Sequence, residues 1–364
     1  MPCPPRSVRC RPRSRSIRAV LALALIALCL GPGTGQADTR VDRALAPFEN
    51  AQAMPPLIAA LPFAADRAYA VLVMIPAPAP VSLADPDTVQ RGVLAFLNPI
   101  ATYRAGTRLG HAMVGWRCAD GTLGLTGKTS DDPDLGLRML RDGWGMAAML
   151  SEYRYGRLVA LADLAPEHQR ALRGDRTRVA AFEIDERACQ SMRRALAAYL
   201  AHPGQPEIRY TNLPDPARMT GDGCASFALW LAGRGGVFDT LAPRFQRRIV
   251  LRASFLGHAD IVPEGIVPFR TGDPGTPVGL RTLLLGDWQA GRVVGALSIL
   301  DPELMLAALD RALARAGIDR EPRLAVSDPD AAPVRAAADR WLTRYTRVTP
   351  VRMGAARAVV LHRR

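Results

Sequence analysis

One cysteine stands where its thiol could act as a nucleophile. Cys224 lies in GDGCASFALWLAG, after Gly221 and Gly223 and before a short apolar segment that ends at Gly233. A helix that begins at Cys224 points free backbone N–H groups and a partial positive charge at the sulfur, which favours the thiolate. The same N–H groups could hold an oxyanion during acyl transfer. The alternative is a small buried core residue, and Asp222 supports it because a nearby carboxylate raises a thiol pKa.

A nucleophilic cysteine needs a base, and the chain offers five histidines. His168 lies in a polar stretch, His202 at the end of a predicted helix and His362 in the C-terminal tail. His111 begins a segment of alternating pattern, which predicts a strand that holds the ring in place, whereas His258 enters a loop. We therefore expect His111 to be the base, with His258 as the alternative.

The strand that begins at His111 is expected to form one half of a hairpin over residues 109–129. An Asp-Gly dipeptide at 120–121 predicts a tight turn, because it supplies the positive φ angles that such a turn requires. If these are the two central turn residues, His111 faces Ser130 on the second strand. A third polar group orients the imidazole in cysteine–histidine sites. Ser130, or its neighbour Thr129, is the candidate for that group.

Both motifs resemble segments of the NlpC-like papain-fold cysteine peptidases. GHAMVGWRCADG resembles their His-bearing strand and turn, and GDGCASFALWLAG resembles the start of their Cys-bearing helix. Tyr210 resembles the tyrosine that precedes the nucleophile in that superfamily and supports the oxyanion. His111 precedes Cys224, and this order is similar to the circularly permuted branch, which includes lecithin:retinol acyltransferase relatives and bacterial amidases or lipid hydrolases. Gly223 departs from the pattern, because relatives commonly carry Asn or Asp beside the cysteine.

The resemblance covers residues 105–235 and implies an α+β, papain-like fold in which a small antiparallel sheet packs on the helix that bears the cysteine. It implies a thiol hydrolase or acyltransferase that acts on an amide or ester through a Cys224 thioester, with His111 as base. The substrate would be a small molecule, a peptide or a lipid. No cofactor is expected, and no metal, because the chain has no Cys-x-x-Cys and no histidine pair at i, i+4. The alternative from another class is a secreted, non-catalytic binding or structural protein in which Cys224 is a core residue.

The first 37 residues have the pattern of a secretory signal peptide. An arginine-rich start precedes an apolar run over 19–30, which is too short to span a bilayer. We therefore expect a soluble protein that is periplasmic or secreted. Removal of residues 1–37 would leave Cys118, Cys189 and Cys224 in an oxidising compartment. Cys118 and Cys189 could bridge, which would leave Cys224 free, or all three could be small buried residues.

The charge pattern argues against nucleic acid as a partner. The chain has 47 Lys and Arg against 34 Asp and Glu, and six of the basic residues lie in the predicted signal peptide, so the mature charge is 41 minus 34, or +7. Nearly all of this positive charge is arginine spread singly through the chain, and aromatic residues make up only 6%. Surfaces that bind nucleic acid cluster Lys and Arg with aromatic residues. The charge supports only a weak association with anionic membrane surfaces or the cell wall.

The remaining sequence suggests one large domain and a C-terminal addition. Residues 38–265 are expected to form the papain-like catalytic domain with an N-terminal extension, and residues 280–364 a C-terminal helical appendage beyond a loop-rich boundary. Apolar runs predict strands over 68–75, 178–184 and 207–210. One helix is expected after Asp185, and Asp301-Pro302-Glu303 is typical of the start of another.

Overall fold

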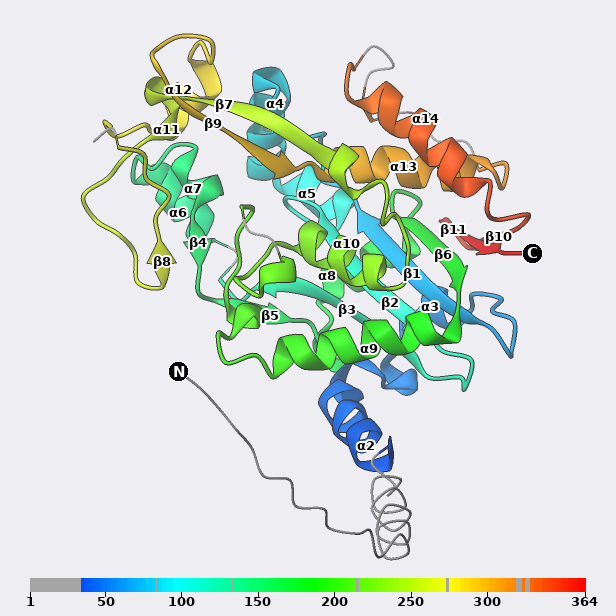
Figure 1. Cartoon of the computed structure of the whole chain (residues 1–364). Helices are drawn as coiled ribbons and strands as arrows, with labels where there is room; N and C mark the ends of the chain where they lie inside the picture. The colour runs from blue at the N-terminus through cyan, green and yellow to red at the C-terminus, as the bar shows by residue number, and fades with distance from the viewer. Residues whose placement is uncertain are drawn as a thin grey trace, which may run out of the picture. The chain divides into compact units, whose positions relative to one another are not determined.

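The computed structural model describes residues 34–364 apart from positions 83, 133, 214–215, 273–274, 319–322 and 325–327. Residues 1–33, which make up most of the predicted signal peptide, lie outside the described residues. Contacts divide the chain into two units, Met1–Arg43 and Ala44–Arg364. The larger unit contains the sheets and every candidate site residue (Figure 1).

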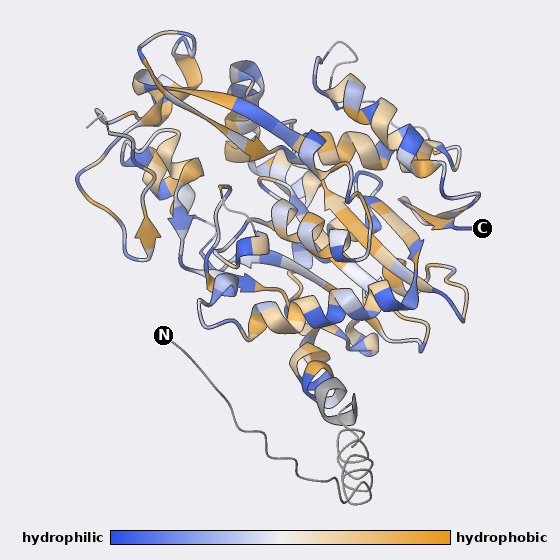
Figure 2. Cartoon of the chain, viewed as in Figure 1, coloured by the Kyte–Doolittle hydropathy of each residue, from blue (hydrophilic) through white to orange (hydrophobic). Residues whose placement is uncertain are grey.

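A seven-stranded sheet forms the centre of the larger unit. Its strand order is β10-β11-β6-β1-β2-β3-β5, and the paired strands are antiparallel except for β11 and β6. The strands are β1 (Ala68–Ile75), β2 (His111–Arg117), β3 (Leu123–Ser130), β5 (Gly156–Leu158), β6 (Arg178–Ile184), β10 (Arg347–Met353) and β11 (Ala356–His362). All of β1 is buried, because its sequence AYAVLVMI offers apolar side chains to both faces of the sheet (Figure 2). The strands expected over 68–75 and 178–184 are confirmed.

Helices cover both faces of this sheet. One face, called the α10 face below, carries α9 (Glu186–Leu200), α10 (Cys224–Arg234), α13 (Pro302–Ala314) and α14 (Ala331–Leu342). The other, the α8 face, carries α3 (Pro56–Ala59), the 3-10 helix η3 (Leu161–Asp163) and α8 (Pro166–Arg173), which share a core with alternate residues of β1 such as Val73. Successive side chains of a strand point to opposite faces, so Met113 of β2 joins this core whereas Val114 points to the α10 face.

A two-stranded ribbon and several short helices form a second core around Trp144 and Phe255. In the ribbon, β7 (Gln246–Arg252) pairs with β9 (Val293–Leu300). The other elements of the chain are α2 (Thr34–Leu45), α4 (Pro86–Leu97), α5 (Pro99–Ala105), α6 (Leu135–Arg141), α7 (Ala147–Leu150), β4 (Glu152–Tyr153), α11 (Ala253–Leu256), β8 (Ile266–Val267) and α12 (Leu280–Leu285), with short 3-10 helices between them. β4 and β8 pair with each other.

The mixed helices and mainly antiparallel strands agree with the predicted α+β class. Two local expectations differ from the structure. Residues 207–210 do not form a strand: Pro206 begins a 3-10 helix, η4 (Pro206–Ile208), because proline lacks the N–H of a strand ladder and suits a first helical turn. The C-terminal segment is not only helical, since β9, β10 and β11 belong to it and β11 pairs with β6 in the central sheet.

Candidate active site

The start of α10 holds Cys224 in a fixed position. Gly223 is the N-cap, and its backbone N–H donates to the Ser226 hydroxyl at 3.0 Å, while that hydroxyl donates back to the Gly223 carbonyl at 3.1 Å. Gly221 has a φ of 104°, in the left-handed region, and a Cβ there would lie 2.7 Å from the Arg209 carbonyl oxygen. A glycine is therefore needed before Cys224, because the chain that enters the helix packs closely against Arg209.

The sulfur of Cys224 lies against the sheet, beside the Tyr210 hydroxyl and the backbone of Ala112. Burial raises the pKa of the Cys224 thiol, and the contacts with Ala112 and Tyr210 offset only part of that effect. Burial also raises the pKa of Tyr210 well above its usual range, and the nearby thiol adds to the rise. The backbone N–H groups of Cys224 and Ala225 at the helix start lower the thiol pKa, as expected, but desolvation of the sulfur is the larger effect and the net shift is upward.

A buried ion pair lies next to the cysteine. Lys128 of β3 and Asp222 are both fully buried, with Nζ and Oδ1 2.5 Å apart. The same ammonium contacts the Tyr199 hydroxyl at 2.7 Å and the carbonyl oxygens of Pro206 and Arg209 at 2.6 and 2.8 Å. These contacts attach the segment that carries Tyr210 and Asp222 to the sheet.

The ionisation of this pair is governed mainly by burial. Burial raises the pKa of Asp222 to about 6, although Lys128 and the Tyr199 hydroxyl both oppose the rise. Burial lowers the pKa of Lys128, and Asp222 opposes that shift. The pair was not expected from the sequence. Its only sequence signal is that a single lysine, in an arginine-rich chain, lies within a predicted strand.

His111 points away from Cys224. It alternates with Ala112 along β2, so its side chain lies on the α8 face, where its ring stacks on that of His168 with centroids 4.4 Å apart and planes 6° apart. The Nε2 atom of His111 is buried and has no hydrogen-bond partner among the described residues. Burial, followed by the neighbouring His168, holds the pKa of His111 well below its usual value. The structure therefore does not bring His111 and Cys224 together.

The predicted hairpin is present, but its register differs by one residue from the expected one. The Cys118 N–H donates to the Thr122 carbonyl at 2.9 Å, and Gly121, at φ 92°, donates to the Cys118 carbonyl at 3.0 Å. The loop is therefore one residue longer than a two-residue turn, and a one-residue shift moves side chains to the other face. By this register His111 lies opposite Thr129 and not Ser130.

The other two candidate residues, Ser130 and His258, contact other parts of the protein and not the thiol. The Ser130 hydroxyl bonds to the backbone of Asp132, accepting from its N–H at 3.3 Å and donating to its carbonyl at 3.4 Å. The ring of His258 packs edge-on against Trp144, in the second core, with centroids 5.7 Å apart. Of the residues proposed for the site, only Tyr210 contacts Cys224.

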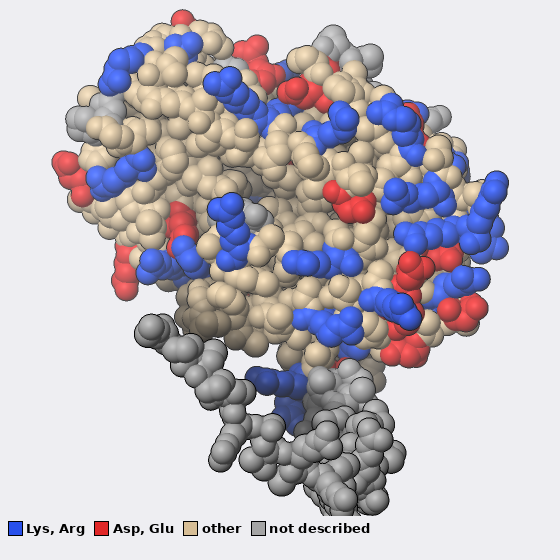
Figure 3. Space-filling model, in the orientation of Figure 1, with Lys and Arg blue, Asp and Glu red and all other residues tan. Residues whose placement is uncertain are grey.

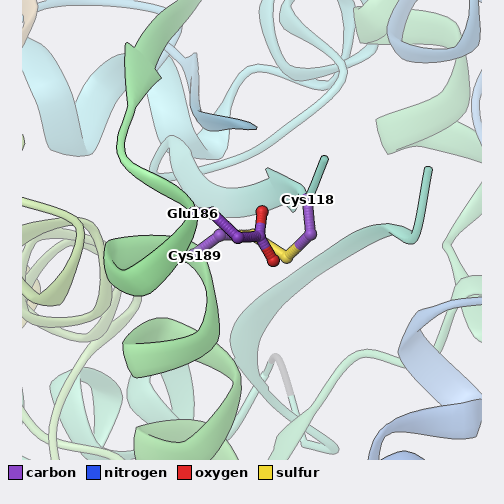
Figure 4. Close-up of side chains that lie close together, drawn as sticks. All are labelled: Cys118, Glu186 and Cys189. Atoms are coloured by element: carbon purple, nitrogen blue, oxygen red, sulfur yellow. A yellow bond between two sulfur atoms is a disulfide. The ribbon is translucent and has the colours of Figure 1, made fainter. Parts of the chain in front are cut away.

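Cys118 and Cys189 form a disulfide, with their Cα atoms 5.6 Å apart, and Cys224 is free. The bridge ties the end of β2 to the first turns of α9, and the Glu186 carboxylate lies beside it (Figure 4). One Glu186 oxygen and the two sulfurs lie within 4.8 Å of one another, but bridged sulfurs are not thiolate ligands for a metal. The disulfide indicates an oxidising, extracellular compartment.

The face of the molecule drawn in Figure 3 carries charges of both signs. In the view of Figure 3, arginines are interspersed with Asp and Glu. Within the described residues, no helix has the length and apolar character needed to cross a bilayer. Comparisons with protein-family models, curated proteins and solved structures found no match. The family resemblance therefore rests on the two sequence motifs.

Proposed function

We propose that the chain is an exported, papain-like thiol hydrolase or acyltransferase that acts on an amide or ester through Cys224. The observation that carries the proposal is the free thiol at the first residue of α10, with the Tyr210 hydroxyl at its sulfur, while the other two cysteines of the described chain are bridged. An unbridged thiol at a helix start, beside a hydroxyl donor, has the components of an acyl-transfer site.

In the proposed reaction, the Cys224 sulfur attacks the substrate carbonyl and the thiol proton passes through a base to the departing alcohol or amine. Backbone N–H groups of α10 and the Tyr210 hydroxyl stabilise the negative charge on the carbonyl oxygen. Water, or another acceptor hydroxyl or amine, then attacks the thioester, releases the acyl product and restores the thiol. The substrate is a small molecule, a peptide or a lipid.

The base remains His111 in this proposal, but only after a rearrangement. Its low pKa keeps the ring neutral, as a base requires, and its Nε2 has no partner among the described residues to give up. The ring must leave His168 and cross to the α10 face. Gly110, at φ 84°, directly precedes His111 and is the residue at which the strand start could turn.

A second candidate is a non-catalytic binding or structural protein with Cys224 as a core residue. Two observations favour it: His111 is stacked on His168, away from the thiol, and burial raises the thiol pKa. A cysteine that has no base beside it and a raised thiol pKa behaves as a small apolar core residue does.

Acylation with a p-nitrophenyl ester separates the two functions. The enzyme proposal predicts a rapid first turnover and a thioester at Cys224, found by mass spectrometry of the intact and digested protein. H111Q and Y210F should slow acylation at least about tenfold, a barrier change of about 1.4 kcal/mol. H258Q is the matched control and should acylate at the wild-type rate. If the folded protein forms no thioester while its denatured form does, Cys224 is an unreactive core residue. The second candidate, a non-catalytic binding or structural protein, is then correct.

A further inference from the structure

Large apolar side chains are exposed along three helices that contact one another, α4, α5 and α12. Six of the 13 large apolar residues that are exposed in the described part of the chain lie on these helices or just after α5. Their exposed fractions run from 38% to 76%, and such groups, unlike single exposed residues, mark interaction surfaces. They are called the apolar patch below and comprise Leu94 and Leu97 of α4, Ile100 and Tyr103 of α5, Leu109, and Leu285 of α12.

The patch continues from α12 over α4 to α5. Gln90, Leu94 and Leu97 occupy positions i, i+4 and i+7 of α4 and therefore share one side of that helix. α12 packs beside α4 (Figure 1), and the Gln90 side-chain amide donates to the Gly286 carbonyl at 3.3 Å, which places Leu285 next to this side. α5 follows α4 after a single residue and contacts it. Ile100 and Tyr103, at i and i+3, share one side of α5.

The loop before β2 brings Leu109 to the patch. The Arg108 guanidinium lies 5.7 Å from the centre of the Phe96 ring of α4 and forms an ion pair with Asp134. Because Arg108 is held at the end of α4, the exposed side chain of the next residue, Leu109, lies beside that end as well.

The charged side chains among the patch residues are arginines. The sequence has no Asp or Glu over residues 88–119, which include five of the six patch residues. Arg91 and Arg104 are exposed, and no ion pair is recorded for either in the described part of the chain. Arg170 of α8 lies 4.4 Å from the centre of the Tyr103 ring. Two exposed acidic residues, at 87 and 287, adjoin the patch only at the start of α4 and after α12, so the α5 end is the more positive one.

We propose that the apolar patch docks on the surface of a lipid bilayer that contains anionic lipids. Its apolar side chains enter the boundary between the headgroups and the acyl chains, while Arg91 and Arg104 contact lipid phosphates. Exposed apolar residues bordered by arginines are the pattern of protein segments that lie in the membrane interface. This role goes beyond the proposed function and does not depend on it, because Cys224 is not part of the patch.

A bilayer fits the patch better than an anionic polymer or a protein does. An anionic polymer such as nucleic acid would contact the arginines but leave the six apolar side chains in water. A protein partner anchors its central side chains in recesses, and the cavities beside His258 and Trp230 include none of the patch residues. A bilayer accepts protruding apolar side chains without a matching shape, and its anionic headgroups complement the arginines.

Co-sedimentation with lipid vesicles tests the proposal. The mature chain is used, because the apolar run over 19–30 would itself bind lipid. Wild type should bind vesicles of phosphatidylglycerol and phosphatidylethanolamine, and should bind phosphatidylcholine vesicles at least about tenfold more weakly. L94Q/I100Q should weaken binding to the anionic vesicles at least about tenfold. Melting curves should stay close to wild type, because both side chains are exposed.

V250Q/I261Q is the matched control for the apolar residues. Val250 and Ile261 are 51% and 78% exposed but lie outside the patch, so this variant should bind vesicles as wild type does. Equal binding by wild type and L94Q/I100Q, equal losses in the two variants, or no binding of wild type to anionic vesicles would each overturn the proposal.

A second pair of variants tests the arginines. R91Q/R104Q should weaken binding to anionic vesicles at least about tenfold at low salt, and should make binding less dependent on salt than in wild type. R244Q/R248Q removes the same charge from two exposed positions outside the patch and should bind close to wild type. If both variants lose binding equally, the overall charge and not the patch attracts the membrane, and the proposal is wrong.

Two further measurements separate the proposal from its alternatives. In sedimentation equilibrium without lipid, wild type should be monomeric. A wild-type dimer that L94Q/I100Q makes monomeric, together with no vesicle binding, would assign the patch to a second copy of the chain. C224S should bind vesicles as wild type does, so a thiol that proves unreactive refutes the proposed function and leaves the membrane surface intact.

Discussion

Replacement of Lys128 by methionine tests whether the buried ion pair holds the Cys224 region together. Lys128 and Asp222 are both fully buried, and the ammonium also contacts the carbonyl oxygens of Pro206 and Arg209. K128M leaves the Asp222 carboxylate buried with only the Tyr199 hydroxyl as a side-chain donor. Removal of one partner from a buried pair costs about 3–5 kcal/mol, so the free energy of unfolding should fall by about that amount at pH 8.

The loss should be smaller at pH 5 than at pH 8. Without Lys128, the pKa of Asp222 in the folded protein rises above the already raised value of about 6, whereas the unfolded value is about 3.9. The folded K128M protein then binds more protons than the unfolded chain between these values, so its stability decreases as the pH rises through that window. The slope is up to about 1.4 kcal/mol per pH unit. K128M/D222N, which removes the charge, should recover at least about 1 kcal/mol at pH 8.

Urea unfolding with the disulfide intact measures these changes, and R311M is the matched control. Arg311 and Asp339 also form a close ion pair, with their atoms 2.7 Å apart, but their side chains are 41% and 44% exposed. An exposed pair contributes about 0–1 kcal/mol. If K128M loses no more than R311M, or loses equally at both pH values, the network does not have the role argued for it.

Two further predictions concern the histidine stack and the disulfide. Burial lowers the pKa of His111 and of His168, so the unfolded chain binds more protons than the folded protein below about pH 6.5. The free energy of unfolding of wild type should therefore decrease as the pH falls below that value. In urea unfolding, H111Q/H168Q should show a weaker pH dependence than the control variant H202Q. Thiol titration of the unreduced mature protein under denaturing conditions should return one free cysteine, and C118S/C189S should lower the free energy of unfolding by about 2–4 kcal/mol; three free thiols would contradict the bridge.

The elements whose sequence pattern is strong were predictable. The run AYAVLVMI forms β1 and RVAAFEI forms β6, because continuous apolar stretches suit strands covered on both faces. Asp301 accepts from the Glu303 N–H at 2.8 Å and begins α13 as expected. These features depend on neighbouring residues, which is why sequence patterns identify them.

The site was less predictable, because it depends on contacts between distant residues. The strand that begins at His111 was predictable, but the face to which the His111 ring points is fixed by its stack on His168, which the motif around His111 does not reveal. The turn at Gly121 changed the register by one residue, which a dipeptide alone does not determine. The Lys128 pair joins residues far apart in the sequence, so it required the fold.

The composition of α10 explains why the thiol pKa of a cysteine at a helix start is raised. Ala225, Ala228 and Ala232 are buried small residues that let the helix approach the sheet closely. Close approach places the Cys224 sulfur against the backbone of Ala112, and desolvation of the sulfur raises the thiol pKa, although Cys224 as a whole is only partly buried. A reactive thiolate at Cys224 therefore needs a base that takes up the thiol proton. Lys128 holds the backbone at Pro206 and Arg209, so the same ion pair that stabilises the fold also fixes the chain that leads to Tyr210, the residue beside the thiol.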